Sequence, residues 1–536
     1  MTELYRRAAV FQFEYRRSPD QDAETPVRHP VVVVGAGPIG LATAIDLAQR
    51  GNRVVLLDDA DRIGEGSRGL CYSKRALEIL DHLGAGARVV AKGVSWKLGK
   101  VFFRDDKVYE FDLLPEAGHK MPAFVNLQQF FLEEYLVERI AELDGIDLRW
   151  SNRVTALDNR PDGVGLTIET PDGPYTIETD WLIAADGARS TLRDMVGAQF
   201  VGRTFEDQFL IADIRMKADF PPERWFWFEP PFHGGQSTLL HRQPDDTWRI
   251  DFQIGADADA QKEQEPDRVR ARLDRMLAGR DYSLEWVSVY RFQCRRMADF
   301  RHGRVFFAGD AAHQVSPFGA RGANSGLEDA ENIAWKLDLV IRGAAPESLL
   351  ATYNLERSAA ADMNIGHSTR STDFISPKGP GAVTLRNAVL DLSRRFDFAR
   401  RMVNSGRLST PATYETPLST PDRDSFAGPA RLGAPLPDAP LTDGEGNDVW
   451  LLDALGPGFT LIAFSDGTPI APLEGVTVLA IGAGWSDPQG LLARRLDATP
   501  GAAYLVRPDQ HLCARFRAFD PDLVRAAIDR ARGMTT

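Results

Sequence analysis

The sequence is poor in cysteine and has no long uninterrupted apolar run. Its three cysteines, Cys71, Cys294 and Cys513, have neither disulfide nor metal-site spacing, so we expect reduced thiols, no bound metal and a cytoplasmic protein. The longest apolar stretch, residues 31–48, is broken by glycine, proline and an acid, and it follows a polar N-terminal arm over residues 1–29. Neither a signal peptide nor a membrane span is therefore expected.

The sequence also lacks an excess of positive charge. Its 63 lysines and arginines are outnumbered by 76 aspartates and glutamates, and the net charge is −13. This balance argues against nucleic acid or an anionic membrane as a partner. With 43% hydrophobic and 26% charged residues among 536, the composition is typical of a globular protein with two or three domains.

One segment carries most of the functional information. Residues 304–308 are typical of a buried parallel strand, and Gly309 and Asp310 follow at its carboxyl end, where open α/β sheets bind their ligands. The glycine-rich run Pro317–Gly326 then leads into a helix expected over 325–341. Because a helix N-terminus with bare amides favours negative charge, the segment predicts an anion-binding loop beside an acid.

A second segment has the pattern of a strand, a glycine-rich turn, a helix and another strand. The first two glycines of Gly35-Ala36-Gly37-Pro38-Ile39-Gly40 permit a tight turn and let a pyrophosphate approach the backbone. The third glycine allows the helix to lie close to the strand. Asp58 ends the next strand, where it can accept a hydrogen bond from a ribose hydroxyl. A third strand, residues 181–185, ends in Asp186.

Together these segments resemble the group A flavoprotein monooxygenases, the single-component aromatic hydroxylases with the para-hydroxybenzoate hydroxylase fold. GAGPIG, DGARS and GDAAH lie in the family's order. We interpret Asp310 as an acceptor for the ribityl hydroxyls of FAD and residues 322–324 as the cradle of the flavin ring. By resemblance, Arg68 lies at the pyrophosphate and Gln129 at the ribityl or adenine side, with the register at Gln129 open by one residue. The predicted cofactor-binding residues are Gly35, Gly37, Pro38, Ile39, Gly40, Asp58, Arg68, Gln129, Asp186, Gly309, Asp310, Pro317, Gly322, Ala323 and Asn324.

The same resemblance implies a reaction. NADH or NADPH would reduce the flavin, which would take up O2 as a C(4a)-hydroperoxide and transfer one oxygen atom to an electron-rich phenolic ring. A phenol with a short acidic side chain is the expected substrate, by similarity to the hydroxyphenylpropionate enzymes. A simple phenol, a larger polyketide-like aromatic molecule and the choice of nicotinamide stay open. The alternative is a flavin-dependent reductase or halogenase of the same fold, and a remote alternative is a non-enzymatic prenyl-protein escort.

Three residues are candidates for the reacting side of the site. Tyr290 resembles in position a substrate-contacting tyrosine of phenol hydroxylases, or it is a strand tyrosine with its hydroxyl at the surface. His241 can line the pocket, although half of the residues on an amphipathic strand point away from it. Arg321 either adds positive potential near the flavin or an acidic substrate, or points to solvent. We predict Tyr290, His241 and Arg321 as catalytic residues, with these alternatives open.

The predicted fold class is α/β, with a Rossmann-like FAD-binding domain interleaved with a β-sheet substrate domain and followed by a C-terminal thioredoxin-like α/β domain. The last domain resembles the tail of the phenol hydroxylases, and its lone Cys513 argues against disulfide exchange and for a structural or homodimer-contact role. A chain that ends near Pro435 is expected to keep its FAD. The predicted parts are an N-terminal arm, 1–29; the FAD-binding domain, 30–92, 126–200 and 295–350; the substrate domain, 93–125 and 201–294; a helical segment, 351–408; a linker, 409–440; and the thioredoxin-like domain, 441–536.

Overall fold

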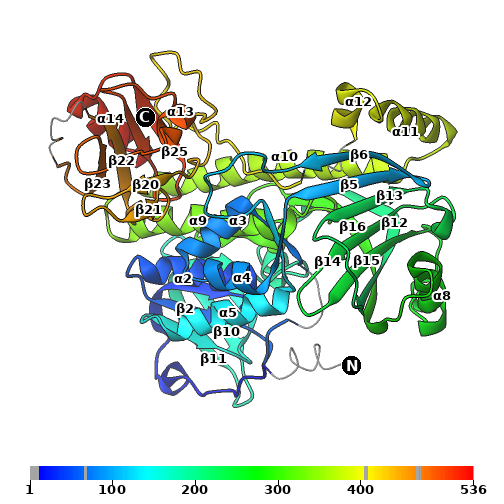
Figure 1. Cartoon of the computed structure of the whole chain (residues 1–536). Helices are drawn as coiled ribbons and strands as arrows, with labels where there is room; N and C mark the ends of the chain where they lie inside the picture. Colours follow the sequence, from blue (N-terminus) through cyan, green and yellow to red (C-terminus); the bar gives the residue numbers. More distant parts are fainter. Residues whose placement is uncertain (1–10, 65–68, 404–407, 466–469, 471, 535–536) are drawn as a thin grey trace.

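The structure is a computed structural model that describes most of the chain (Figure 1). The described residues are 11–64, 69–403, 408–465, 470 and 472–534. Within them lie two eight-stranded sheets and one four-stranded sheet with helices packed on them, which confirms the α/β class. No helix in these ranges is both long and apolar enough to cross a membrane.

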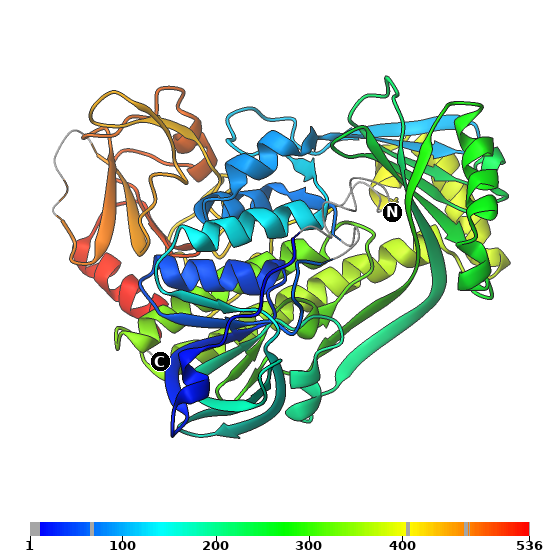
Figure 2. The ribbon, with the colours of Figure 1, turned by 90° about the horizontal axis from the view of Figure 1, so that it is seen from below.

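The first sheet contains the strands expected around the glycine-rich turn. Its elements and their covering helices are β1 (Val27–Val34), β2 (Val54–Leu57), β8 (Ile146–Arg149), β9 (Arg153–Arg160), β10 (Gly163–Glu169), β11 (Tyr175–Ala184), β17 (Arg301–His302), β18 (Val305–Phe307), α2 (Pro38–Gln49), α5 (Gln129–Ala141) and α6 (Thr191–Met195). β1 pairs in parallel with β2 and β11, and β11 pairs in parallel with β18. The predicted parallel strands are therefore confirmed, and their carboxyl ends meet at one edge. α2 and α5 lie side by side over this sheet (Figure 2).

The second sheet is antiparallel over most of its width and has two differently used faces. Its strands are β5 (Leu98–Phe103), β6 (Asp106–Asp112), β12 (Phe200–Arg215), β13 (Arg224–Phe228), β14 (Thr238–Arg242), β15 (Thr247–Ile254), β16 (Ser283–Met297) and β19 (His313–Gln314). In space they follow the order β19-β16-β12-β15-β14-β13-β5-β6. One face packs on α8 (Pro266–Leu277) through an apolar cluster, and the other carries an aromatic cluster that includes Phe318 of the glycine-rich loop. We call this second face, which contacts the glycine-rich loop through Phe318, the inner face.

Short elements join the two large sheets. They are η1 (Pro19–Asp22), β3 (Cys71–Ser73), α3 (Lys74–His82), α4 (Gly86–Lys92), β4 (Val94–Trp96), β7 (Phe124–Asn126), η2 (Pro231–His233), α7 (Ala260–Glu263), η3 (Gly309–Ala311) and η4 (Glu347–Leu350). β3, β7 and β4 form a small sheet of their own.

The helix after the glycine-rich loop begins earlier than expected. α9 spans Gly322–Ile341, whereas the sequence predicted a start near Ser325. The Ser325 amide donates to the carbonyl of Arg321 at 2.8 Å, which closes a helical turn over the small residues that the sequence suggested were loop. The long α10 (Ala351–Ile375), α11 (Pro380–Ser393) and α12 (Asp397–Met402) follow.

The C-terminal part forms a third sheet. Its elements are β20 (Pro440–Thr442), β21 (Asp448–Trp450), β22 (Phe459–Phe464), β23 (Val476–Ile481), α13 (Leu491–Leu496), β24 (Ala503–Val506), β25 (Leu512–Phe516) and α14 (Pro521–Ala531). The order is β23-β22-β24-β25, with β22 and β23 parallel and the other pairs antiparallel, as in a thioredoxin-like unit. It shares a core with the rest of the molecule, because Trp335, Leu339 and Leu349 pack against its sheet and α14.

A buried ionic network also joins the C-terminal part to α9 and α10. Arg507, after β24, donates to both carboxylate oxygens of Glu356 at 2.7 and 3.0 Å. Lys336 and Asn332 of α9 donate to the same carboxylate at 2.7 and 2.8 Å. Because these charged groups are buried together, each depends on the others for its neutralisation. The network and the shared core change the expectation for a chain ending near Pro435, which we now expect to be destabilised and to retain FAD poorly.

The substitution Arg507→Met is expected to destabilise the whole protein rather than the C-terminal part alone. It leaves a buried carboxylate without its bidentate partner, a loss worth about 3–5 kcal/mol in the free energy of unfolding. Urea unfolding followed by fluorescence and by flavin release measures the change. The control Arg525→Met breaks the exposed pair with Asp522 on α14 and should change stability far less. Equal effects of the two substitutions would contradict the role given to the network.

Candidate functional site

Two glycines of the first turn are required by close backbone approach. Gly35 has φ +106°, and a Cβ built there would lie 2.4 Å from the carbonyl oxygen of Ala185, at the end of β11. A Cβ on Gly40 would lie 1.8 Å from the carbonyl oxygen of Gly35. Both positions therefore need glycine for the turn, the helix and the neighbouring strand to meet.

Gly37 differs, because the fold itself does not require glycine there. Its backbone is extended, with φ −77° and ψ −178°, and a Cβ would meet no atom within 4 Å. Gly37 precedes Pro38, which is the first residue of α2. Proline lacks an N–H, but an N–H at this position of a helix has no intrahelical acceptor, so its absence costs no hydrogen bond. The open space in front of this helix N-terminus fits the pyrophosphate of a dinucleotide. Ile39, in contrast, is a packing residue, since a Cβ on Gly309 or on Gly326 would come within 3.0 Å of its side chain.

Asp58 stands beside the same turn and already has protein partners. Its carboxylate accepts hydrogen bonds from the amide of Ala36 and, at 2.8 Å, from that of Ala60. Burial raises the pKa of Asp58 to about 6. A carboxylate has about four acceptor positions, so a ribose hydroxyl can still be accommodated. Asp58 therefore stabilises the turn in addition to its predicted contact with ribose.

Asp186 follows the carboxyl end of β11, as Asp58 follows the carboxyl end of β2. One of its oxygens accepts from the amide of Leu192 at 3.2 Å, in the first turn of α6, and burial raises the pKa of Asp186. Gly187 follows with φ +78°, which turns the chain away from the sheet. The acid thus combines a local capping contact with its position at the ligand-binding edge.

Asp310 and the start of α9 lie together at that edge. Gly309 turns the chain with φ +60°, and Asp310 is exposed. A Cβ built on Gly322 would lie 4.0 Å from Oδ1 of Asp310, so the acid lies next to the first turn of α9. The first N–H groups of a helix have no intrahelical acceptor, and no side chain caps this one. The amides of residues 322–324 are therefore available to an anionic edge of a ligand.

The side chain of Asn324 serves the protein. It donates to the carbonyl of Cys71 at 3.0 Å and accepts from the amide of Ser73 at 3.0 Å, which ties β3 to α9. Only its backbone, like those of Gly322 and half-buried Ala323, is available to the flavin, while Pro317 is exposed at the start of the loop.

Hydrogen bonding distinguishes between Gln129 and its neighbour Gln128 as the residue that could contact the cofactor. Gln129 accepts from the amide of Gly69 at 2.8 Å and donates to Glu133 at 2.8 Å. Its neighbour Gln128 is completely buried, and both atoms of its amide are without a partner among the described residues. A buried orphan amide beside this edge makes Gln128 a better cofactor contact than Gln129, and only burial could have distinguished the two. Arg68 lies outside the described residues.

The three predicted catalytic residues lie in two groups. His241 of β14 is 3% exposed, and burial together with the charges of Arg224 and Arg249 lowers its pKa well below the ordinary value. Arg321 is 2% exposed, so the alternative in which it points to solvent is wrong; burial and Arg224 lower its pKa to about 10. Tyr290 is half-buried on β16 opposite Phe209, with β12 and β15 between it and β14. The structure therefore places His241 and Arg321 each near Arg224 and sets Tyr290 apart.

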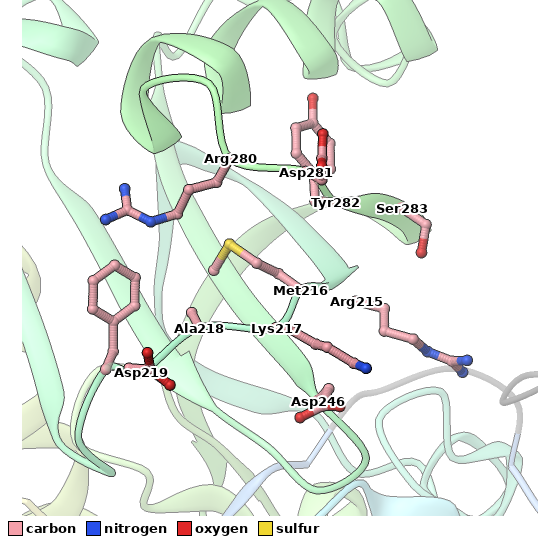
Figure 3. Close-up of a pocket in the computed structure, with 11 residues that line it drawn as sticks. Arg215, Met216, Lys217, Ala218, Asp219, Asp246, Arg280, Asp281, Tyr282 and Ser283 are labelled. Carbon is pink, nitrogen blue, oxygen red and sulfur yellow. The ribbon is translucent and has the colours of Figure 1, made fainter.

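A separate surface groove contains none of these residues. It has a volume of about 760 Å³ and lies where β12 ends and β16 begins (Figure 3). Both basic and acidic side chains line it. Its lining is Arg215, Met216, Lys217, Ala218, Asp219, Phe220, Asp246, Arg280, Asp281, Tyr282 and Ser283.

The chain is similar to flavin-dependent monooxygenases along most of its length. A family model described as FAD binding domain matches residues 28–368. The 6-methylpretetramide 4-monooxygenase of Streptomyces rimosus is 31% identical over 521 residues, 90% of each chain. A 3-(3-hydroxy-phenyl)propionate/3-hydroxycinnamic acid hydroxylase of Mycolicibacterium smegmatis is 26% identical over 81% of this chain and 77% of its own. The solved structure of the flavin-dependent monooxygenase PieE, in complex with FAD and substrate, matches with a TM-score of 0.81 at 25% identity, over 95% of this chain and 100% of that one.

Gly37→Val is expected to abolish retention of FAD while leaving the fold intact. A Cβ there meets no protein atom within 4 Å, so the valine side chain enters the space assigned to the pyrophosphate. Flavin content of the purified protein and its thermal unfolding measure the two properties. Gly255→Val is the control, since a Cβ at Gly255 also meets nothing within 4 Å. Full flavin occupancy in Gly37→Val would remove the turn from the cofactor site.

FAD affinity is expected to rise with pH between 5 and 7. The pKa of Asp58 is about 6 in the ligand-free protein, and a hydroxyl that donates to the carboxylate lowers it further, so FAD binding releases a proton. Affinity at pH 5 should therefore be about tenfold weaker than at pH 7 and should level off above it. Titration of the apoprotein with FAD at several pH values tests this. In Asp58→Asn the pH dependence of FAD affinity should disappear. A pH dependence that persists in this variant would show that another group is responsible.

Proposed function

The chain belongs to the FAD-binding-domain family of flavin-dependent aromatic monooxygenases, and from this premise we propose that it hydroxylates a phenolic ring with O2 at the expense of NADH or NADPH. The observation that carries the proposal is the arrangement of Asp310 and the bare amides of α9 opposite the inner face of the second sheet. Phe318 of the glycine-rich loop connects them, because it contacts Phe209 of β12 and Phe292 of β16 edge-on at 4.8 and 5.3 Å between ring centroids.

The residues at the first sheet's edge hold the cofactor in this proposal. Asp310 would accept hydrogen bonds from the ribityl hydroxyls, the amides of residues 322–324 would face the flavin, and Gln128, rather than the already bonded Gln129, would contact the ribityl or adenine side. The chemistry that FAD supplies when bound is acceptance of hydride from a nicotinamide and activation of O2. A helix N-terminus at the ring stabilises negative charge there.

The inner face of the second sheet positions the substrate. Its aromatic cluster excludes water from the reacting atoms, which protects oxygen transfer from side reactions. His241 is held neutral, and its Nδ1 is buried without a partner among the described residues, so it can accept a hydrogen bond from the hydroxyl of a phenol at that atom. Arg321 supplies positive potential that favours the phenolate, and Tyr290 lines the more apolar end of the pocket. An ionised phenol is more electron-rich, which is what oxygen transfer to the ring requires.

The proposed substrate is a phenol with an acidic oxygen function. A single ring with a short acidic side chain is the first candidate, as in the name of the mycobacterial relative. A polycyclic phenol is the second candidate, because the Streptomyces relative is the more similar of the two over a larger share of this chain.

A screen of NADH and NADPH oxidation over both classes of phenol tests the function. We expect substrate-dependent oxidation with one oxygen atom from ¹⁸O2 in the product. Oxidation without oxygen in any product would favour a reductase, and a product formed only with added halide would favour a halogenase. Failure of the purified protein to bind FAD would favour the non-enzymatic, escort-like alternative.

A further inference from the structure

Arg224 is the first residue of β13 and lies on the inner face of the second sheet. Burial alternates along the strand, with Arg224, Phe226 and Phe228 buried and the two tryptophans between them half-buried. Phe226 and Phe228 belong to the same apolar cluster as Phe318 of the glycine-rich loop. Since alternate strand residues share a face, Arg224 points toward the flavin-binding part of the molecule.

The guanidinium of Arg224 forms no ion pair with any residue that the structure describes. Arg224 is 7% exposed, yet no carboxylate among the described residues lies within 4.0 Å of it, and it has no hydrogen-bond partner among them. Arg249, two strands away on the same face, shows the usual solution: it pairs with Asp213 at 2.9 and 3.1 Å. Burying an unpaired charge is costly, so proteins keep one mainly where a ligand completes it.

The surroundings of Arg224 are positive and polar. The strand register pairs Trp225 with Leu240, which puts His241 beside Arg224 at the next position. Arg321 lies close enough for the charge of Arg224 to lower the pKa of Arg321. The nearby acid Asp251 lies 3.8 Å from His241 and outside ion-pair distance of Arg224. Burial lowers the pKa of Arg224, and the opposing effects of Cys71 and Asp251 do not offset it.

We propose that Arg224 binds a delocalised two-oxygen anion of the aromatic substrate, either a carboxylate or an ionised 1,3-dicarbonyl, with Nδ1 of His241 as an adjoining hydrogen-bonding group. The planar fork of a guanidinium matches two such oxygens and forms two parallel hydrogen bonds with them. This inference rests on the proposed function and adds to it the residue that recognises the acidic group of the substrate. It also explains why the cationic group sits on the substrate sheet rather than at the pyrophosphate side.

Binding to the FAD-loaded protein tests the proposal, with the perturbation of flavin absorbance as the signal. The first probe pair is 3-(3-hydroxyphenyl)propionate and its carboxamide; the second is a phenolic 1,3-diketone and its enol methyl ether, which cannot ionise. We expect the anion of at least one pair to bind about tenfold to a hundredfold tighter than its neutral analogue, as for charge-assisted bidentate bonds. The pair that shows the preference identifies the type of anion.

Variants assign the preference to this residue. Arg224→Gln should abolish it, and Arg224→Lys should keep a part of it. The matched control is Arg242→Gln, an arginine of the adjacent strand whose guanidinium lies 5.7 Å over the ring of Trp248 on the opposite face, and the preference should persist there. A preference that survives in Arg224→Gln, or its absence with both probe pairs in the wild-type protein, overturns the proposal.

Two further measurements separate a ligand-binding role from a structural one and from failure of the proposed function. Arg224→Met should leave the melting temperature of the ligand-free protein unchanged or higher, because it removes an unpaired buried charge. A lower melting temperature, or weaker binding of FAD, overturns the proposal. If neutral and anionic phenols are hydroxylated equally well, the proposed function stands and the role of Arg224 is rejected. If anions bind preferentially but no phenol is hydroxylated, the role of Arg224 in binding stands and the proposed function is rejected.

Discussion

The carboxylate of Asp329 is the point on which the geometry of the site depends. It is fully buried and accepts from the amide of Gly309 at 2.9 Å, from Nε2 of His313 at 2.7 Å and from Arg357 at 2.6 Å. Three segments, the turn before Asp310, helix α9 and helix α10, therefore meet at one charged group. Because a buried charge must be matched by its partners, none of these segments can shift without leaving it uncompensated.

Buried charged groups also connect the C-terminal part to α10. Arg357 also donates to the hydroxyl of Tyr414 at 2.7 Å, in a stretch that has neither helix nor strand. Glu356, the preceding residue of α10, receives Arg507 from the C-terminal sheet. Adjacent residues of one helix thus connect the flavin-binding turn and the thioredoxin-like unit. The accessory unit neutralises charges that the rest of the molecule buries, which gives it a physical role that requires no cysteine chemistry.

The two large sheets have different roles in the proposed site. The parallel sheet offers the carboxyl ends of its strands, where glycines and acids suit a dinucleotide. The antiparallel sheet offers a face, where alternation puts aromatic rings and a few polar groups on one side. Phe318 brings the two together, since it belongs to the cofactor loop in sequence and to the aromatic cluster of the second sheet in space.

The sequence by itself determined the parallel strands, the order of the motifs and two positions of the first turn, Gly35 and Gly40, that need glycine. These features are local, because a tight turn or a helix N-terminus is encoded by residues that are adjacent in the chain. It could not determine which face of a strand Arg224 or His241 occupies, that Arg321 is buried, or that the amide of Gln129 is already bonded while that of Gln128 is not. Those properties depend on partners hundreds of residues away, so only the tertiary structure decided which polar groups the protein satisfies and which it leaves for a ligand.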